Sequence, residues 1–140
     1  MPPQFDYVVV GSGIAGLYAS LLAQEHGSVL ILTKGSIDEC NTRYAQGGIA
    51  AAVGPDDSPE LHLEDTVRAG AGLVDIEAAR ILVESAPDRI RDLVRFGVPF
   101  DSIDGEVALG KEAAHSRNRI LHAGGDSTGA HIELSLSTLA

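Results

Sequence analysis

The sequence predicts an α/β fold built on parallel strands, and three observations near its beginning predict it. A continuous apolar run, Tyr7 to Val10, leads directly into the turn Gly11-Ser12-Gly13-Ile14-Ala15-Gly16. Leucines at helical spacing follow the turn, and a second apolar run covers residues 29–32. Strand, glycine turn, helix and strand in this order predict a βαβ unit over residues 6–33, right-handed by the usual rule. This unit is typical of the start of a Rossmann-like nucleotide-binding domain.

The first strand is predicted to lie in the centre of its sheet. Because Tyr7 to Val10 is apolar without alternation, we expect this strand to be buried on both faces. The helix that follows the turn is predicted to end at Gly27 in a left-handed cap.

Each glycine of the turn has its own role in dinucleotide binding. Gly11 permits a tight turn, Gly13 lets backbone N–H groups approach a pyrophosphate, and Gly16 lets the helix pack close to the strand. The helix N-terminus then faces the phosphates. A plain glycine turn is the alternative, but the flanking strand and helix favour the dinucleotide site.

The end of the second strand carries Thr33-Lys34 where an NAD site usually has a carboxylate for the ribose. The missing carboxylate disfavours NAD. Lys34 can neutralise a phosphate, which leaves NADP or FAD open, and a simple solvated lysine is the alternative.

Composition excludes several classes of partner. The 140 residues carry a net charge of −10, so we expect no nucleic acid and no membrane surface as a partner. No targeting segment is visible at the N-terminus. The single cysteine, Cys40, fits a reducing compartment, and we expect a cytoplasmic protein.

A polar loop and a small-residue segment follow the βαβ unit, over residues 34–53. Gly47-Gly48 permits positive φ angles or a close backbone approach to a ligand, and Asn41, Thr42, Arg43 and Gln46 offer donors beside it. A second cofactor-contacting loop and an ordinary polar turn both fit this composition.

These motifs together resemble the flavoprotein family of L-aspartate oxidase, fumarate reductase and succinate dehydrogenase. The resemblance rests on the glycine turn, on Thr33-Lys34-Gly35 and on the run from Asn41 to Ala51. It implies FAD as the cofactor, and we call residues 34–53 the flavin loop. The candidate FAD-binding residues are Gly11, Ser12, Gly13, Ile14, Ala15, Gly16, Lys34, Asn41, Thr42, Arg43, Tyr44, Ala45, Gln46, Gly47 and Gly48.

The residues at two positions distinguish between the members of this family. The respiratory members carry, where Asn41 stands, a histidine joined covalently to the flavin, so the resemblance implies non-covalent FAD here. The run from Gly110 to Ser116, followed by Arg119 to Ala123, is similar to the L-aspartate oxidase pattern. Glu112 stands where the dicarboxylate reductases have phenylalanine, and a carboxylate there can pair with the ammonium group of aspartate. The alternative is an ordinary glutamate on a surface loop, without a role in binding.

The same segment departs from the family pattern. Ala113-Ala114 replaces two glycines, which restricts the loop. His115 and His122 are candidates for polar contacts at a dicarboxylate, and we assign neither a catalytic role.

A helical segment over residues 58–97 connects these motifs. Ser58 and Pro59 predict one helix start, Asp75 a second and Pro87 a third, with the acids and arginines of this segment on solvated faces. We find no metal-ligand spacing in the chain. A substrate-side segment over residues 105–129 includes a small β feature near Val107 and a loop that enters a final helix.

The sequence therefore predicts that residues 1–140 are the N-terminal part of an FAD-binding domain. We expect the remaining strands, the proton acceptor and most substrate ligands to lie farther along the polypeptide. The resemblance implies oxidation of L-aspartate to iminoaspartate, with oxygen or fumarate as the electron acceptor, in NAD biosynthesis. Glu112 would orient the substrate, and we expect the segment alone to be inactive. A soluble fumarate reductase is the runner-up, and a non-catalytic nucleotide-binding module is the alternative from another class.

Overall fold

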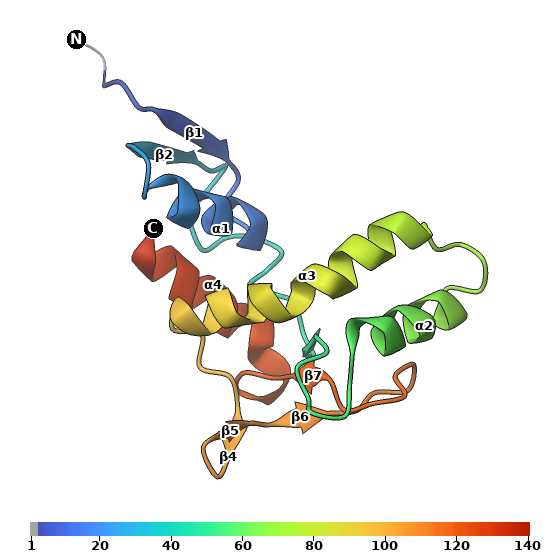
Figure 1. The fold of residues 1–140 in the computed structure, drawn as a ribbon. Helices are drawn as coiled ribbons and strands as arrows, with labels where there is room; N and C mark the ends of the chain where they lie inside the picture. The colour runs from blue at the N-terminus through green and yellow to red at the C-terminus, as the bar shows by residue number, and fades with distance from the viewer. Residues whose placement is uncertain (1–2) are drawn as a thin grey trace.

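The predicted βαβ unit is present in the computed structural model, which describes residues 3–140. Twelve elements follow one another along the described residues (Figure 1). They are β1 Tyr7–Val10, α1 Ile14–Ala23, β2 Val29–Leu32, β3 Ile49–Ala50, α2 Pro59–Ala69, α3 Ile76–Arg95, β4 Ser102–Ile103, β5 Glu106–Val107, β6 Leu109–Gly110, β7 Ile120–Leu121, a 3₁₀ turn at Gly125–Ser127 and α4 Thr128–Leu139.

Strands β1 and β2 pair in parallel, in a register that places Tyr7 opposite Val29 and Val10 opposite Leu32. The prediction that β1 is buried on both faces is wrong for the described residues. Val8 is 56% exposed and Val10 is 82% exposed. The sheet has two strands, and α1 packs against both of them, so the side chains that point away from α1 stay in solvent.

The predicted left-handed cap at Gly27 is also wrong. Helix α1 ends at Ala23, and the cap residue Gln24 keeps a right-handed helical conformation. Gly27 instead approaches Asp6, whose carboxylate accepts hydrogen bonds from the backbone and hydroxyl of Ser28. The glycine is therefore needed where the chain passes close to the start of β1.

Two of the predicted helix starts are confirmed. The Ser58 hydroxyl accepts a hydrogen bond from the backbone N of Leu61, and the Asp75 carboxylate accepts one from Ala78. Such caps satisfy the backbone donors that the first turn of a helix leaves unpaired.

The third predicted start is wrong, because Pro87 lies inside α3, which runs unbroken from Ile76 to Arg95. A proline in a helix interior costs about 3 kcal/mol through one lost hydrogen bond and a clash. The buried stripe on both sides of it, Val83, Ile90 and Leu93, holds the helix together across this position.

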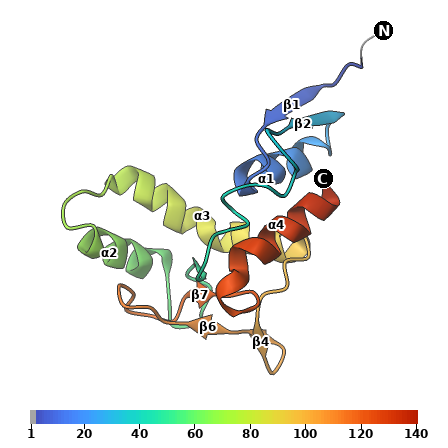
Figure 2. The ribbon, with the colours of Figure 1, turned by 180° about the vertical axis from the view of Figure 1, so that it is seen from behind.

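One apolar core joins the βαβ unit to the rest of the chain. Leu17 of α1, Leu93 of α3, Leu121 of β7 and Leu136 of α4 are all buried in it. Helix α4 lies against α1, as both views show (Figure 2). A three-stranded antiparallel sheet, ordered β3, β7, β6, contributes Leu121 to this core, and Ile49 and Leu109 of the same sheet pack against it. None of the helices in residues 3–140 is long and apolar enough to cross a membrane.

Candidate functional site

The glycine turn has the geometry that the sequence predicts. Gly11 follows β1 with a φ of 107°, which other residues rarely adopt. A Cβ on Gly16 would collide with the carbonyl oxygen of Gly11, so this close contact between helix and strand requires glycine. The hydroxyl of buried Ser12 lies 3.1 Å from that of Thr33, which ties the turn to the end of β2. The N-terminus of α1 is thereby fixed beside the strand ends.

The flavin loop packs between the N-terminus of α1 and the start of α4. The Thr42 hydroxyl accepts a hydrogen bond from the backbone N of Ile14 at 3.0 Å. The backbone N of Gly129 donates to the carbonyl of Ala45 at 3.3 Å. A cavity of about 240 Å³ opens between these segments. Its lining residues are Ile14, Thr42, Ala45, Gln46, Gly47, Gly48, Ile49, Thr128, Gly129 and Ile132.

The cavity brings together part of the predicted set and leaves other members outside its lining. Arg43 pairs with Asp38, and the Tyr44 hydroxyl lies 3.3 Å from Glu39, so both side chains turn toward carboxylates of their own loop. Asn41 is exposed and outside the lining. Lys34 is exposed beyond the end of β2, next to Thr33.

The β3, β7, β6 sheet connects the flavin loop to the substrate-side segment through His122. A Cβ built on Gly48 would lie 2.9 Å from Nε2 of His122. The same nitrogen is 3.9 Å from Oε1 of Glu112. His122 also lines a cavity of about 420 Å³ together with Asp101 and Gly110. The two motifs that the sequence could relate only by resemblance are therefore neighbours in space.

A buried cluster of charges supports this substrate-side segment. Arg119 is fully buried and binds Asp57 through two hydrogen bonds of 2.7 and 2.8 Å. Its Nη1 donates to Asp65 at 2.9 Å and lies 3.4 Å from Nδ1 of His115. Asp65 contradicts the prediction that the acids of residues 58–97 lie on solvated faces, because it is 2% exposed.

The neighbours of Asp65 decide its ionisation. Burial raises the pKa of Asp65, but hydrogen bonds from Ser116 and the charges of Arg119 and Arg68 outweigh it and bring the pKa to about 2. His62 lies beside this cluster with Nδ1 unpartnered. Burial, Arg119 and His115 lower its pKa, which favours the neutral ring at neutral pH.

The depressed pKa of Asp65 predicts a loss of stability in acid. A carboxyl with a folded pKa of about 2 and an ordinary value of 3.8 stabilises the folded chain above pH 4, and this contribution disappears as the pH falls toward 2. Urea unfolding of the chain and of its Asp65→Asn variant measures this contribution. We expect the stability difference between them to be largest near neutral pH and to shrink below pH 4. A difference independent of pH would contradict the assignment.

A second buried carboxylate lies behind the flavin loop. Glu133 of α4 is 1% exposed, and the thiol of Cys40 donates to its Oε2 at 3.0 Å. Its other oxygen is unpartnered in the structure. Neither residue belongs to the predicted site, since neither carries a sequence signal of binding. Together they attach the beginning of the flavin loop to α4.

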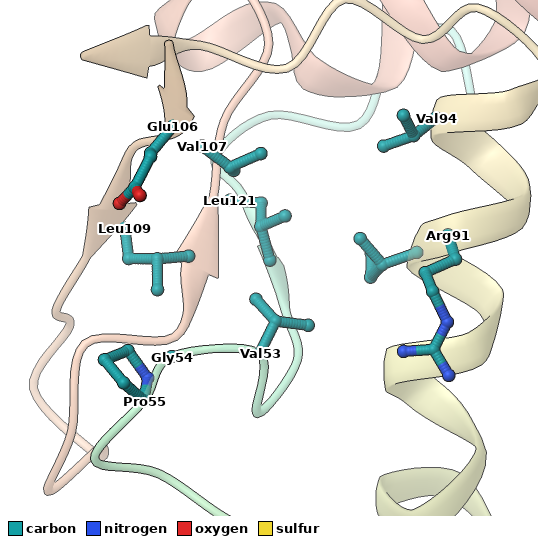
Figure 3. A pocket seen from close by; sticks show the side chains of 10 residues that line it. Val53, Gly54, Pro55, Arg91, Val94, Glu106, Val107, Leu109 and Leu121 are labelled. Atoms are coloured by element: carbon teal, nitrogen blue, oxygen red, sulfur yellow. The ribbon is translucent and has the colours of Figure 1, made fainter. Parts of the chain in front are cut away.

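The apolar cavity of Figure 3 is a separate feature. It has a volume of about 400 Å³ and lies between α3 and the strands, with Val94, Val107 and Leu121 among its lining residues. It contains none of the predicted site residues. Across residues 3–140, no group of three or more histidine, cysteine or acidic side chains is arranged to hold a metal ion.

The known proteins that this chain resembles have much longer chains than this one. The chain is 53% identical over 133 residues to the L-aspartate oxidase of Streptomyces coelicolor and 50% identical over 136 residues to that of a Nostoc species. These alignments cover 94% and 97% of this chain but 23% of each relative. The chain thus spans about a quarter of the curated relatives it matches.

Two solved structures share the fold at moderate identity. Sdh1 of Mycobacterium smegmatis superposes with a TM-score of 0.87 at 36% identity, covering 96% of this chain and 23% of that one. An E. coli quinol fumarate reductase FrdA variant superposes with a TM-score of 0.88 at 30% identity, and the match covers 98% of this chain and 24% of that one. The family described as FAD binding domain matches residues 6–138. Because this match takes in nearly every element described above, including the glycine turn and the flavin loop, the chain belongs to the FAD binding domain family.

Proposed function

We propose that the chain is the N-terminal part of an FAD-dependent L-aspartate oxidase, which converts L-aspartate to iminoaspartate at the first step of NAD biosynthesis. The observation that carries the proposal is the place of His122, which lies against Gly48 of the flavin loop and 3.9 Å from Glu112. The similarity to L-aspartate oxidases over 94 to 97% of the chain supports it.

The residues of the glycine turn and the flavin loop fit FAD. A cavity of about 240 Å³ between them has a largely apolar lining with backbone groups of Gly47 and Gly48, as a flat aromatic ring system requires. The helix N-terminus at Gly13 would hold the pyrophosphate, and Lys34 would neutralise a phosphate charge. When bound, FAD supplies the acceptor for the hydride. Asn41 has no imidazole to bond to the flavin, so we propose non-covalent binding.

Glu112 would select the substrate. Its carboxylate is partly exposed beside the cavity that His122 lines, where it can pair with the ammonium group that distinguishes aspartate from succinate. Oxygen or fumarate would reoxidise the cofactor. We propose a cytoplasmic location for the enzyme, whose plant relatives are named chloroplastic.

A fumarate reductase or succinate dehydrogenase flavoprotein is the second candidate. The fold likeness to FrdA and Sdh1 favours it, whereas Glu112 argues against it. A non-catalytic nucleotide-binding module would bind the cofactor without turning over either substrate.

The absorption spectrum of the purified protein, with and without added FAD, tests the cofactor. We expect a flavin spectrum and complete release of the flavin on acid precipitation, because Asn41 forms no covalent bond. Flavin that stays with the precipitate would contradict non-covalent binding.

Anaerobic bleaching of the flavin band of the full-length, FAD-loaded protein tests the substrate. We expect L-aspartate to reduce the flavin and succinate to leave it oxidised. Reduction by succinate alone would favour the second candidate, and reduction by neither would favour the non-catalytic module.

A further inference from the structure

The segment that carries Glu112 is a loop between two short antiparallel strands. Residues 111–119 connect β6 to β7. The backbone N of Arg119 donates to the carbonyl of Gly110 at 3.0 Å, which closes a loop of residues 111–118. Within it, the backbone N of His115 donates to the carbonyl of Glu112 at 3.0 Å. The Glu112 side chain is 58% exposed, so its position depends on the backbone that carries it.

One carboxylate oxygen from a distant helix fixes this loop. Oδ2 of Asp65 in α2 accepts hydrogen bonds from the backbone N of Ser116 at 2.7 Å, from its hydroxyl at 2.8 Å and from Arg119 at 2.9 Å. The loop and α2 lie side by side in Figures 1 and 2. Asp65 therefore holds the chain at the residue after His115, whose backbone in turn holds Glu112.

The negative charge of Asp65 is needed for this arrangement. The cluster pairs two buried aspartates, Asp57 and Asp65, with the one buried guanidinium of Arg119, and Arg68 reaches Asp65 from the surface. An asparagine at 65 would match the shape but accept more weakly. Whichever way its amide turned, it would lose the charge that Ser116 and Arg119 face.

We infer that Asp65 is a positioning residue for Glu112, and hence for recognition of the substrate ammonium group, an inference that rests on the proposed aspartate oxidase function. Asp65 acts through Ser116 and does not touch the substrate. Its loss would let the 111–118 loop move while leaving the glycine turn in place, because contacts with Thr33 and Thr42 hold that turn.

The first test is steady-state kinetics of the full-length, FAD-loaded protein. In Asp65→Asn we expect the KM for L-aspartate to rise about tenfold with a smaller change in kcat. The inhibition constant of succinate, which has no ammonium group, should stay within about twofold. Glu112→Gln should give the same split. The double variant should be no worse than Glu112→Gln alone, since the two residues act in one chain of contacts.

Two further measurements keep the outcome decisive. Hydrogen exchange should quicken in residues 111–118 of Asp65→Asn and stay unchanged in residues 12–16, a result that does not depend on any substrate. If Asp65→Asn folds poorly, Ser116→Ala replaces it as the test variant. This substitution removes only the hydroxyl contact with Asp65, so we expect a smaller effect on the KM for L-aspartate and on hydrogen exchange, in the same direction.

Equal losses of aspartate and succinate binding, additive effects in the double variant, or unchanged exchange in the loop would overturn the inference. Failure of the unsubstituted enzyme to oxidise aspartate would instead overturn the proposed function, and the exchange result would still report on the loop.

Discussion

Replacing Arg119 by methionine is expected to lower the free energy of unfolding by about 3 to 5 kcal/mol. The substitution keeps most of the side-chain volume but removes the cation between Asp57 and Asp65, both of which are at most 2% exposed. Two buried carboxylates would then face each other without their shared partner. Urea unfolding followed by circular dichroism measures the change.

A surface arginine provides the matched control. Arg80 pairs with Glu84 along α3 and is partly exposed, so Arg80→Met should change the free energy of unfolding by no more than about 0.5 kcal/mol. Adding Asp65→Asn to Arg119→Met should recover part of the loss, because it removes one of the two buried negative charges. Equal stability of Arg119→Met and Arg80→Met would show that the buried cluster does not hold the segment.

Gly129→Ala is expected to weaken FAD binding tenfold or more, a loss of about 1.4 kcal/mol or more. Helix propensity alone favours alanine by about 1 kcal/mol. The local geometry opposes it, since a Cβ on Gly129 would collide with the carbonyl oxygen of Thr42 and lie 2.7 Å from that of Ala45. These are backbone atoms of the flavin loop, so the loop must move away from α4.

Titration of the purified variant with FAD, followed by flavin fluorescence, measures the effect. Gly35→Ala is the control in the same loop, because its Cβ would meet the Glu39 side chain at an ordinary 3.9 Å. The helix content of both variants should match that of the unsubstituted chain. Unchanged FAD affinity in Gly129→Ala would falsify the role of this contact in shaping the cofactor site.

Local patterns predicted the parts of the fold that local forces decide. The apolar run into Gly11 and the caps at Ser58 and Asp75 specify their elements within a few residues. Pro87 misled the prediction, because the sequence shows the cost of a proline but not the burial of Val83 and Ile90 that offsets it.

The geometry of the candidate site was predictable where its residues are adjacent in sequence, as in the turn from Gly11 to Gly16. The contacts that support this site were not predictable from the sequence. Arg119 meets Asp57 and Asp65 across 62 and 54 residues, and no periodicity in a single sequence relates such positions. The close approach of Gly129 to the flavin loop depends in the same way on how α4 packs.

The support of the flavin loop by α4 has a consequence for the order of events during synthesis. The thiol of Cys40, in the first part of the loop, donates a hydrogen bond to Glu133, which lies 93 residues later in the chain. At a translation rate of about 5 to 20 residues per second, the ribosome needs about 5 to 20 seconds to add those residues. The glycine turn can fold early, but the nascent loop has no α4 to rest on during this interval, so the contact between Cys40 and Glu133 forms only after α4 has emerged.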